Sequence, residues 1–206
     1  MSIIERKLRQ KESLRQQILD AAREILLANG YAHLSMRRIA EQIEYSPTTI
    51  YHYFINKEDI LHHLCVEALE RQFESISAAG SSEQSTFLRL RSSIRAYIDF
   101  GLSEPDRYKI IYMADISQYV SMASILEEGS AANKLCKLMR NMVKDVLFES
   151  ASTLDPETVF QTIWAHIHGI VALLIGRPDF PWVEREKLIE TGLDLSLAGL
   201  ARKGTG

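Results

Sequence analysis

The ten residues Tyr45–Phe54, YSPTTIYHYF, bring hydroxyl, imidazole and aromatic side chains together in one short stretch. Threonine and tyrosine hydroxyls are uncharged hydrogen-bonding groups that suit phosphate oxygens and the edges of bases. A threonine methyl group can also contact the methyl group of thymine. The chemistry that this segment indicates is therefore recognition of nucleic acid.

Enzyme signatures are missing from the sequence. It has no G-x-S-x-G, S-x-x-K, H-E-x-x-H, C-x-x-C, G-x-G-x-x-G or phosphate-binding loop motif. His166 and His168 are two residues apart on an expected helix, so they point to different faces and cannot readily share a metal. His62 and Cys65 have a compatible spacing but lack a third ligand. We therefore expect neither catalysis nor a cofactor or metal, and we expect His168 to make a buried hydrogen bond or to line a pocket.

The elements that position these residues are expected to be helices throughout. Apolar residues recur at intervals of three and four, and the chain holds only five prolines and ten glycines. The predicted fold class is all-α, with about nine helices. We expect them at 13–29, from 35, from 47, and at 57–79, 86–100, 105–115, 118–149, 156–175 and 181–201.

Two of the expected helices are short and closely spaced, which predicts a helix-turn-helix over about residues 35–54. Ser35 is a good N-cap for the first helix. Ser46 caps the second, with Pro47 at its first helical position, where proline is favoured. Ile50 and Phe54, four residues apart, form the inward side of this second helix. In such motifs the second helix lies in the major groove of DNA.

With that inward side assigned, the polar residues of the second helix face outward. Thr48, Thr49 and His52 lie on its other faces, Tyr45 lies at the turn, and Tyr51 and Tyr53 flank the edge toward the groove. The helix N-terminus also presents free N–H groups to a phosphate. A surface helical hairpin that never contacts DNA has the same spacing, so that alternative stays open at this point.

Charge and composition favour a cytoplasmic globular protein with a mildly basic head. Residues 1–53 hold 8 Lys and Arg against 6 Asp and Glu, whereas the whole chain has a net charge of −3. The two cysteines, Cys65 and Cys136, are expected to be buried and reduced. The N-terminus shows no secretory signal. The longest uncharged apolar run, Ile163–Ile175, is too short to cross a bilayer.

Residues 18–61 resemble the DNA-binding head of TetR-family transcriptional regulators. The match includes Ile18-x-x-Ala21-Ala22, Gly30-Tyr31, the run at 35–40, Ser46-Pro47, Ile50-Tyr51, Tyr53-Phe54 and Lys57-Glu58. The resemblance implies a DNA-binding domain at 1–56 and a ligand-binding and dimerisation domain at 57–206. It also implies that three residues contact phosphate: Ser35, Arg37 and Lys57. Six more are implied to face DNA: Tyr45, Ser46, Thr48, Thr49, Tyr51 and His52.

The recognition helix departs from the commonest pattern of base recognition. It contains no Arg or Lys, so the bidentate contact with guanine is not available from it. Upstream, a basic arm holds Arg6, Lys7, Arg9 and Lys11. This arm either adds contacts to the DNA backbone or minor groove, or is a frayed, solvated tail.

The rest of the chain resembles the C-terminal domain of a TetR subgroup that carries a Trp–His–Gly signature. The matching residues are Pro105-x-x-Tyr108-x-x-x-Tyr112 and Trp164-x-x-x-His168-Gly169. The resemblance implies a homodimer through the last two helices, with apolar residues from Ile163 to Leu174 and from Leu188 to Leu197. It also implies a small-molecule pocket, with these candidate lining residues: Phe87, Ile94, Tyr97, Ile98, Tyr108, Tyr112, Met113, Met122, Met139, Met142, Trp164 and His168.

The function expected on these grounds is that of a DNA-binding transcriptional regulator. It would act as a homodimeric repressor on a palindromic operator and be released by an apolar or amphipathic small molecule. One alternative is an all-α small-molecule carrier whose helix-turn-helix is structural. The other is a regulator that acts as an activator or without a ligand.

Overall fold

The computed structural model describes residues 2–116 and 119–200, and this part of the chain is helical without any strand. The predicted fold class is therefore confirmed, with ten α-helices and one short 3-10 helix, η1, in the described ranges. The elements are α1 Ile3–Asn29, η1 Tyr31–His33, α2 Met36–Gln42, α3 Pro47–Tyr51, α4 Lys57–Ser81, α5 Thr86–Ser103, α6 Pro105–Tyr112, α7 Met122–Ile125, α8 Ala131–Glu149, α9 Pro156–Gly176 and α10 Arg185–Leu197.

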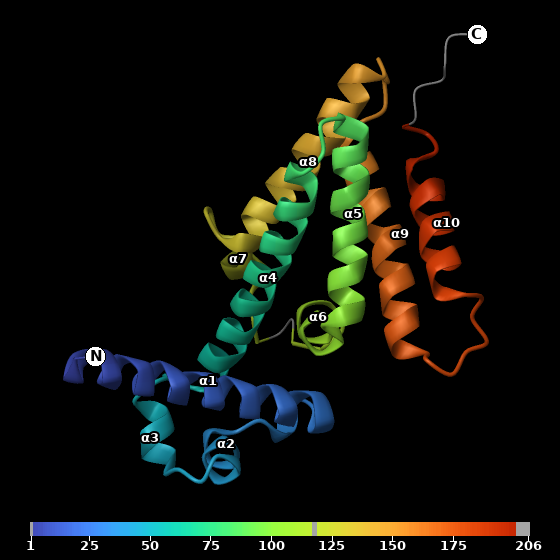
Figure 1. The fold of residues 1–206 in the computed structure, drawn as a ribbon. Helices are drawn as coiled ribbons and strands as arrows, with labels where there is room; N and C mark the ends of the chain where they lie inside the picture. The colour runs from blue at the N-terminus through green and yellow to red at the C-terminus, as the bar shows by residue number, and fades with distance from the viewer. Residues whose placement is uncertain (1, 117–118, 201–206) are drawn as a thin grey trace. The chain divides into compact units, whose positions relative to one another are not determined.

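The chain divides into two compact units. The first comprises the residues up to Ala68 together with Lys109–Ile125. Its core is built around Ile18, Ile39, Ile50 and Phe54, which are at most 1% exposed. Helix α1 packs on α2, and α2 packs on α3, so that the two short helices lie along one side of α1 (Figure 1).

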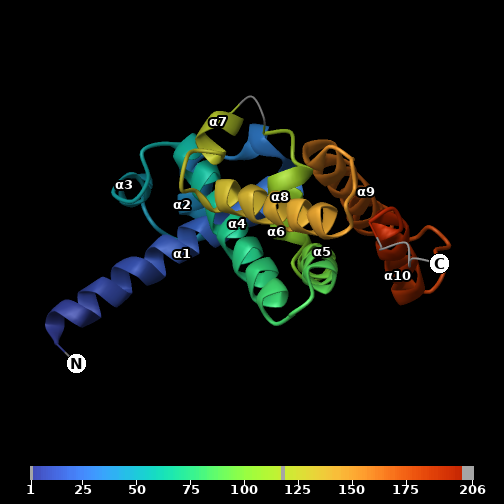
Figure 2. The same ribbon diagram turned by 90° about the horizontal axis from the view of Figure 1, so that it is seen from above.

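The second unit comprises Leu69–Tyr108 and the chain from Leu126 onward. Helix α5 contacts α8, α9 and α10, and Figure 2 shows α8 and α9 above it and α10 to its right. Its buried residues include Leu90, Ile94, Tyr97 and Ile98. This arrangement buries the apolar side of α5 within a bundle.

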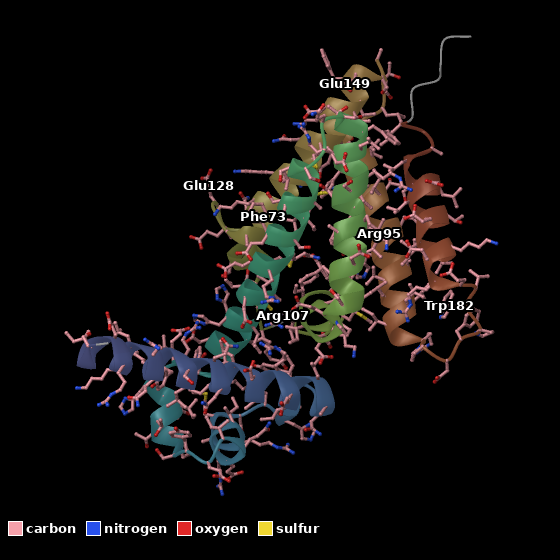
Figure 3. The ribbon with its side chains drawn as sticks, in the orientation of Figure 1. Phe73, Arg95, Arg107, Glu128, Glu149 and Trp182 are labelled. Carbon is pink, nitrogen blue, oxygen red and sulfur yellow. The ribbon has the colours of Figure 1, made fainter. Side chains whose placement is uncertain are left out.

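Charged side chains tie α5 to α10. The Arg95 guanidinium lies 2.8 Å from the Glu190 carboxylate and also pairs with Glu186, and Figure 3 shows Arg95 on the side of α5 toward α10. Arg91, one turn earlier, pairs with Glu190 and with Asp194 at 3.2 Å. These pairs repeat at intervals of four residues on both helices, so they set the register between the two.

Two predictions of helix bounds were wrong. Helix α1 begins at Ile3 rather than near Ser13, because Ser2 and Glu5 form a capping box. The single helix expected at 118–149 is instead α7 and α8. Gly129, with a φ of 85°, precedes the Ser130 N-cap that starts α8. The predicted start at Gln118 and the predicted end at Ala201 lie outside the described residues.

Four further helix ends differ from the predicted ones by two or more residues. Helix α5 ends at Ser103 rather than Phe100, and α6 ends at Tyr112 rather than Asp115. Helix α4 continues through Ser81, because Gly80 is not a helix stop but a point of close packing. A Cβ atom on Gly80 would lie 2.5 Å from Ser93 Oγ and 2.8 Å from the Met142 Cε. Helix α10 begins at Arg185, where the Glu184 carboxylate accepts from the N–H of Lys187 at 2.8 Å.

Helix α9 is long and apolar enough, by length and composition alone, to cross a membrane. The uninterrupted apolar run Ile163–Ile175 is shorter than this helix, which also includes polar residues such as Thr158 and Gln161. The core helix of a bundle passes the same test of length and composition. Helix α9 contacts α5, α8 and α10, and 22% of its apolar window is buried in the single chain.

Candidate nucleic-acid interface

The predicted helix-turn-helix is formed by α2, a tight turn and α3. Ser35 Oγ accepts from the Arg38 N–H at 3.2 Å, which caps α2 as predicted. Ser46 Oγ accepts from the Thr49 N–H at 3.2 Å and caps α3, whose first residue is Pro47. Both N-cap predictions are confirmed.

The turn between α2 and α3 depends on an unusual backbone conformation. Glu44 has a φ of 59°, in the left-handed region that favours glycine. This conformation allows the N–H of Tyr45 to donate to the Ala40 carbonyl at 2.9 Å, which closes the end of α2. The turn therefore places Tyr45 and the Ser46 cap directly after α2.

Helix α3 has one buried and one exposed side. Ile50 is 0% exposed and anchors the helix, and Phe54, just beyond its end, is 1% exposed. On the other side, Tyr45 is 46% and Tyr51 is 57% exposed. Thr48 and His52 are exposed as well. An exposed tyrosine on each side of uncharged hydroxyls is an arrangement that fits a polar, grooved surface such as DNA.

Thr49 differs from its neighbours because its hydroxyl is already engaged. Its Oγ1 shares a hydrogen bond of 2.9 Å with Ser46 Oγ, and the residue is partly buried. Thr49 and Ser46 thus stabilise the first turn of α3. Thr48 has an exposed side chain and takes no part in this cap.

Arg37 and Lys57, two of the residues predicted to contact phosphate, have different surroundings. The Arg37 side chain is 82% exposed, and its Nε donates to the Glu41 carboxylate at 2.8 Å. An ion pair exposed to this degree is weak, so a phosphate can replace the carboxylate. Lys57 is partly buried, and its Nζ lies 4.1 Å from the centroid of the Tyr31 ring.

The start of α4 is held by a group of side chains around Tyr31. Asn56 Oδ1 accepts from the Asp59 N–H at 2.8 Å, so Asn56 caps α4 as predicted. The Tyr31 hydroxyl donates to the Glu58 carboxylate, and this hydrogen bond lowers the Glu58 pKa. Burial, and then the bond to Glu58, raises the pKa of Tyr31. Tyr119 stacks on the Tyr31 ring with centroids 3.6 Å apart. These contacts orient the ring over which the Lys57 ammonium lies.

The residues proposed for a ligand pocket fall into separate groups. Five of them, Ile94, Tyr97, Ile98, Met139 and Met142, are buried on α5 and α8, and Phe87 on α5 is partly buried. Trp164, on α9, is 41% exposed. Three others belong to the unit that contains the helix-turn-helix: Tyr112, which is partly buried, and the exposed Met113 and Met122. The last two, Tyr108 and His168, belong to the second unit.

A chain of hydrogen bonds joins four of these residues across α5, α6 and α9. The Trp164 Nε1–H donates to the Tyr97 hydroxyl at 3.2 Å, and the Tyr97 and Tyr108 hydroxyls lie 3.0 Å apart. The Tyr108 hydroxyl and His168 Nδ1 are separated by 2.6 Å. Burial lowers the His168 pKa, so its neutral form is favoured. The prediction that His168 makes a buried hydrogen bond is consistent with this geometry.

Close packing surrounds this hydrogen-bonded chain. A Cβ atom on Gly101 would lie 2.5 Å from Val171 Cγ1 and 2.9 Å from Tyr108 Cδ2. Two open grooves can be described in the chain, and none of the twelve candidate residues lines either. One lies between α4 and α5, next to Arg71, Asp99 and Glu104, and the other lies beside the helix-turn-helix.

The stripe predicted for dimer contacts packs mainly inside the chain. Ile163, Ile167, Val171, Leu174, Leu193 and Leu197 are all buried in the single chain. Leu195 is 67% exposed, Leu173 is 51% exposed and Trp164 is 41% exposed. The apolar side chains of α9 and α10 that remain accessible are thus different from most of those predicted.

The sequence analysis did not predict the conformation of Glu44 or the ion pairs between α5 and α10. The four-residue spacing of Glu186, Glu190 and Asp194 was a usable signal, because it matches Arg91 and Arg95 on α5. Nothing local marks Glu44, because glutamate rarely adopts the left-handed conformation that it has here.

Comparison with known proteins places this geometry in a family. A model described as "Bacterial regulatory proteins, tetR family" matches residues 18–64, and one described as "Tetracyclin repressor-like, C-terminal domain" matches residues 90–195. With the exposed recognition helix, these matches define a helix-turn-helix DNA-binding transcriptional regulator. The chain belongs to the TetR family.

Individual relatives agree with this assignment. The Fatty acid metabolism regulator protein of Bacillus subtilis is 31% identical over 146 residues, 69% of this chain and 70% of that protein. The HTH-type transcriptional repressor KstR of Rhodococcus jostii is 40% identical over 73 residues, 35% of this chain and 32% of that protein. The solved structure of the fatty acid degradation regulator FadR from Bacillus halodurans has a TM-score of 0.74 at 20% identity, over 92% of this chain and 97% of that one, which shows the shared fold.

Proposed function

We propose that this regulator is a cytoplasmic repressor that binds a palindromic operator as a homodimer and leaves it when an apolar or amphipathic small molecule binds. It has no enzymatic role in this proposal. The observation that carries it is the exposed side of α3. Thr48 and Tyr51 on this helix and Tyr45 just before it are exposed, while Ile50 on the opposite side is buried.

The proposal assigns DNA binding to residues 1–56 and ligand binding and dimerisation to residues 57–206. In the first part, hydroxyl and imidazole groups on α3 meet base edges and nearby phosphates, while the starts of α2 and α4 meet the backbone. The proposed contact residues are Ser35, Arg37, Tyr45, Ser46, Thr48, Thr49, Tyr51, His52 and Lys57.

Dimerisation is proposed through α9 and α10. Trp164, Leu173 and Leu195 offer apolar surface on these two helices that the chain itself leaves accessible. One head reads one half-site, so two heads must sit about 34 Å apart to reach successive major grooves. A two-fold dimer meets this requirement and matches a palindromic site.

The proposed effector site lies around the hydrogen-bonded chain of Tyr97, Tyr108, Trp164 and His168. Apolar side chains surround these polar groups, a combination that suits an apolar molecule with one polar end. Because a relative is named as a fatty acid metabolism regulator, acyl-chain compounds are the first to test. On the basis of Trp164, His168 and Gly169, we also propose that the chain belongs to the subgroup with a Trp–His–Gly signature.

Release from DNA follows if the effector binds better to a state whose heads do not match the operator. The size of the shift between the two states is then set by the difference between the effector's affinities for them. Packing around Gly101 is tight, so we expect ligand binding to require rearrangement of α5, α6 and α9.

The test combines operator binding with thermal unfolding. Acyl-chain compounds of increasing length are added to the full chain, and both the melting temperature and the affinity for a fluorescent operator are measured. A true effector raises the melting temperature, because it binds the folded state, and lowers operator affinity. A compound that raises the melting temperature but leaves operator affinity unchanged contradicts release, and it would favour a carrier.

A further inference from the structure

Helix α1 extends well beyond the core that it helps to form. Its first fully buried residue is Ile18, whereas residues 4–13 are all exposed. The capping box of Ser2 and Glu5 closes the far end, so this stretch is a capped helix and not a frayed tail. At 1.5 Å per residue, the exposed stretch is roughly 15 Å long. We call residues 3–13 the α1 extension.

An open groove separates the α1 extension from the helix-turn-helix. One wall belongs to α1 and the other to Tyr45 and Tyr53, which flank α3. No carboxylate lines the groove, although Glu5 and Glu12 belong to the same extension. The lining residues on α1 are Lys7, Gln10, Lys11, Ser13, Leu14 and Gln17.

The positive charges of the groove come from one face of α1. Lys7 and Lys11 are four residues apart, so their side chains are neighbours on the helix surface. Arg9 lies between them in sequence, but at 3.6 residues per turn it projects from the opposite side. The groove therefore combines two ammonium groups with amide and hydroxyl groups, and these are the groups that proteins use to bind phosphate oxygens.

We propose that this groove holds the sugar–phosphate backbone of the DNA that flanks the bases facing α3. Lys7 and Lys11 neutralise phosphates there, while Gln10, Gln17 and the two tyrosines donate hydrogen bonds. The operator footprint then extends beyond the bases read by the recognition helix. This inference rests on the proposed function, because it needs α3 to face DNA.

Continuity with the recognition surface favours DNA over a separate anionic partner. Tyr45 lines the groove and also directly precedes the Ser46 cap of α3. A strand that passes α3 therefore reaches the groove without leaving the protein surface. Lys and Arg also exceed Asp and Glu in residues 1–53, by 8 to 6, and this is opposite to the balance of the remaining chain.

The experiment compares two lengths of operator DNA with three forms of the full chain. The short fragment ends at the protected bases, and the long one adds about one turn of duplex, roughly 10 base pairs, on each side. The double variant K7Q/K11Q removes the charges in the groove. The control R6Q/R9Q removes the same number of charges from residues outside the groove lining and leaves Lys7 and Lys11 in place.

Wild type is expected to bind the long fragment more tightly, and the double variant is expected to lose that gain. The slope of log affinity against log salt should fall by about 0.9 for each lost phosphate contact, or by roughly three to four units for a dimer. The control should keep the gain from the flanks. Thermal unfolding should be unchanged in all variants, because the substituted side chains are exposed.

Each other outcome overturns the inference. If the double variant keeps the gain from the flanks, the groove does not hold the backbone. If the control loses as much as the double variant, only general charge is involved. If wild type binds both fragments equally, the inference fails while the proposed function stands. If wild type binds neither fragment in preference to scrambled DNA, the proposed function itself has failed.

Discussion

Ser46 and Thr48 separate the stability of α3 from its contacts with DNA, because only one of them supports the helix. Ser46 Oγ accepts from the Thr49 N–H at 3.2 Å and shares a hydrogen bond of 2.9 Å with the Thr49 hydroxyl. Replacing an N-cap serine with alanine costs about 1 kcal/mol. Thr48 is exposed and outside the cap, so Thr48→Ala should change the free energy of unfolding by less than about 0.5 kcal/mol.

Operator affinity should respond differently from stability. Loss of one hydrogen bond to DNA is worth about 1 kcal/mol, or roughly fivefold in affinity, so Thr48→Ala should weaken operator binding by about that factor. Ser46→Ala should weaken it at least as much, because the helix is also less well capped. Urea unfolding measures the first quantity, and fluorescence anisotropy with labelled operator measures the second.

Two results would contradict these roles of Ser46 and Thr48. Ser46→Ala with an unchanged urea midpoint would mean that the cap does not stabilise the head. Thr48→Ala with unchanged operator affinity, in a protein of unchanged stability, would remove Thr48 from the interface. Binding to scrambled DNA serves as the control, because loss of a base contact should leave it nearly unchanged.

The remaining predictions concern the turn and the start of α4. Glu44→Gly should stabilise the head by about 0.5–1 kcal/mol, because it relieves the left-handed conformation at some cost in chain entropy; a lower urea midpoint would contradict this. Lys57→Ala should weaken binding to operator and scrambled DNA alike and lower the salt slope by about one unit per lost contact, whereas an unchanged slope would exclude a phosphate contact. Tyr31→Phe removes the hydrogen bond that lowers the Glu58 pKa, so the variant should be less stable at neutral pH. Since a lowered carboxylate pKa contributes stability above its unfolded value and loses it as pH falls, the difference from wild type should shrink below about pH 4, and a constant difference would contradict the assignment.

Local signals explain why much of the recognition element could be predicted. Ser35, Ser46 and Asn56 are N-caps, and a cap depends only on residues within one turn. Ile50 and Phe54 were recognisable by their spacing, because one face of a short helix must be buried. The same kind of local signal marks the start of α1, where Ser2 and Glu5 match a capping box.

Features that depend on packing between distant segments could not be predicted. Tyr31 meets Glu58 and Tyr119 only after folding, and the sequence separation hides these contacts. The positive φ of Glu44 occurs at a residue type that rarely adopts it. For the candidate ligand residues, aromatic and methionine side chains are equally typical of a core, so sequence could not separate packing from binding.

Sequence-specific binding by a dimer can be measured with DNA from the neighbourhood of the gene. Purified protein is titrated against the DNA that flanks its own gene and against scrambled DNA, across a salt series, with the stoichiometry determined at each site. We expect tight binding to one fragment with two protomers, or a multiple of two, per site. Equal and steeply salt-dependent binding to both fragments, or no binding at low salt, would contradict it.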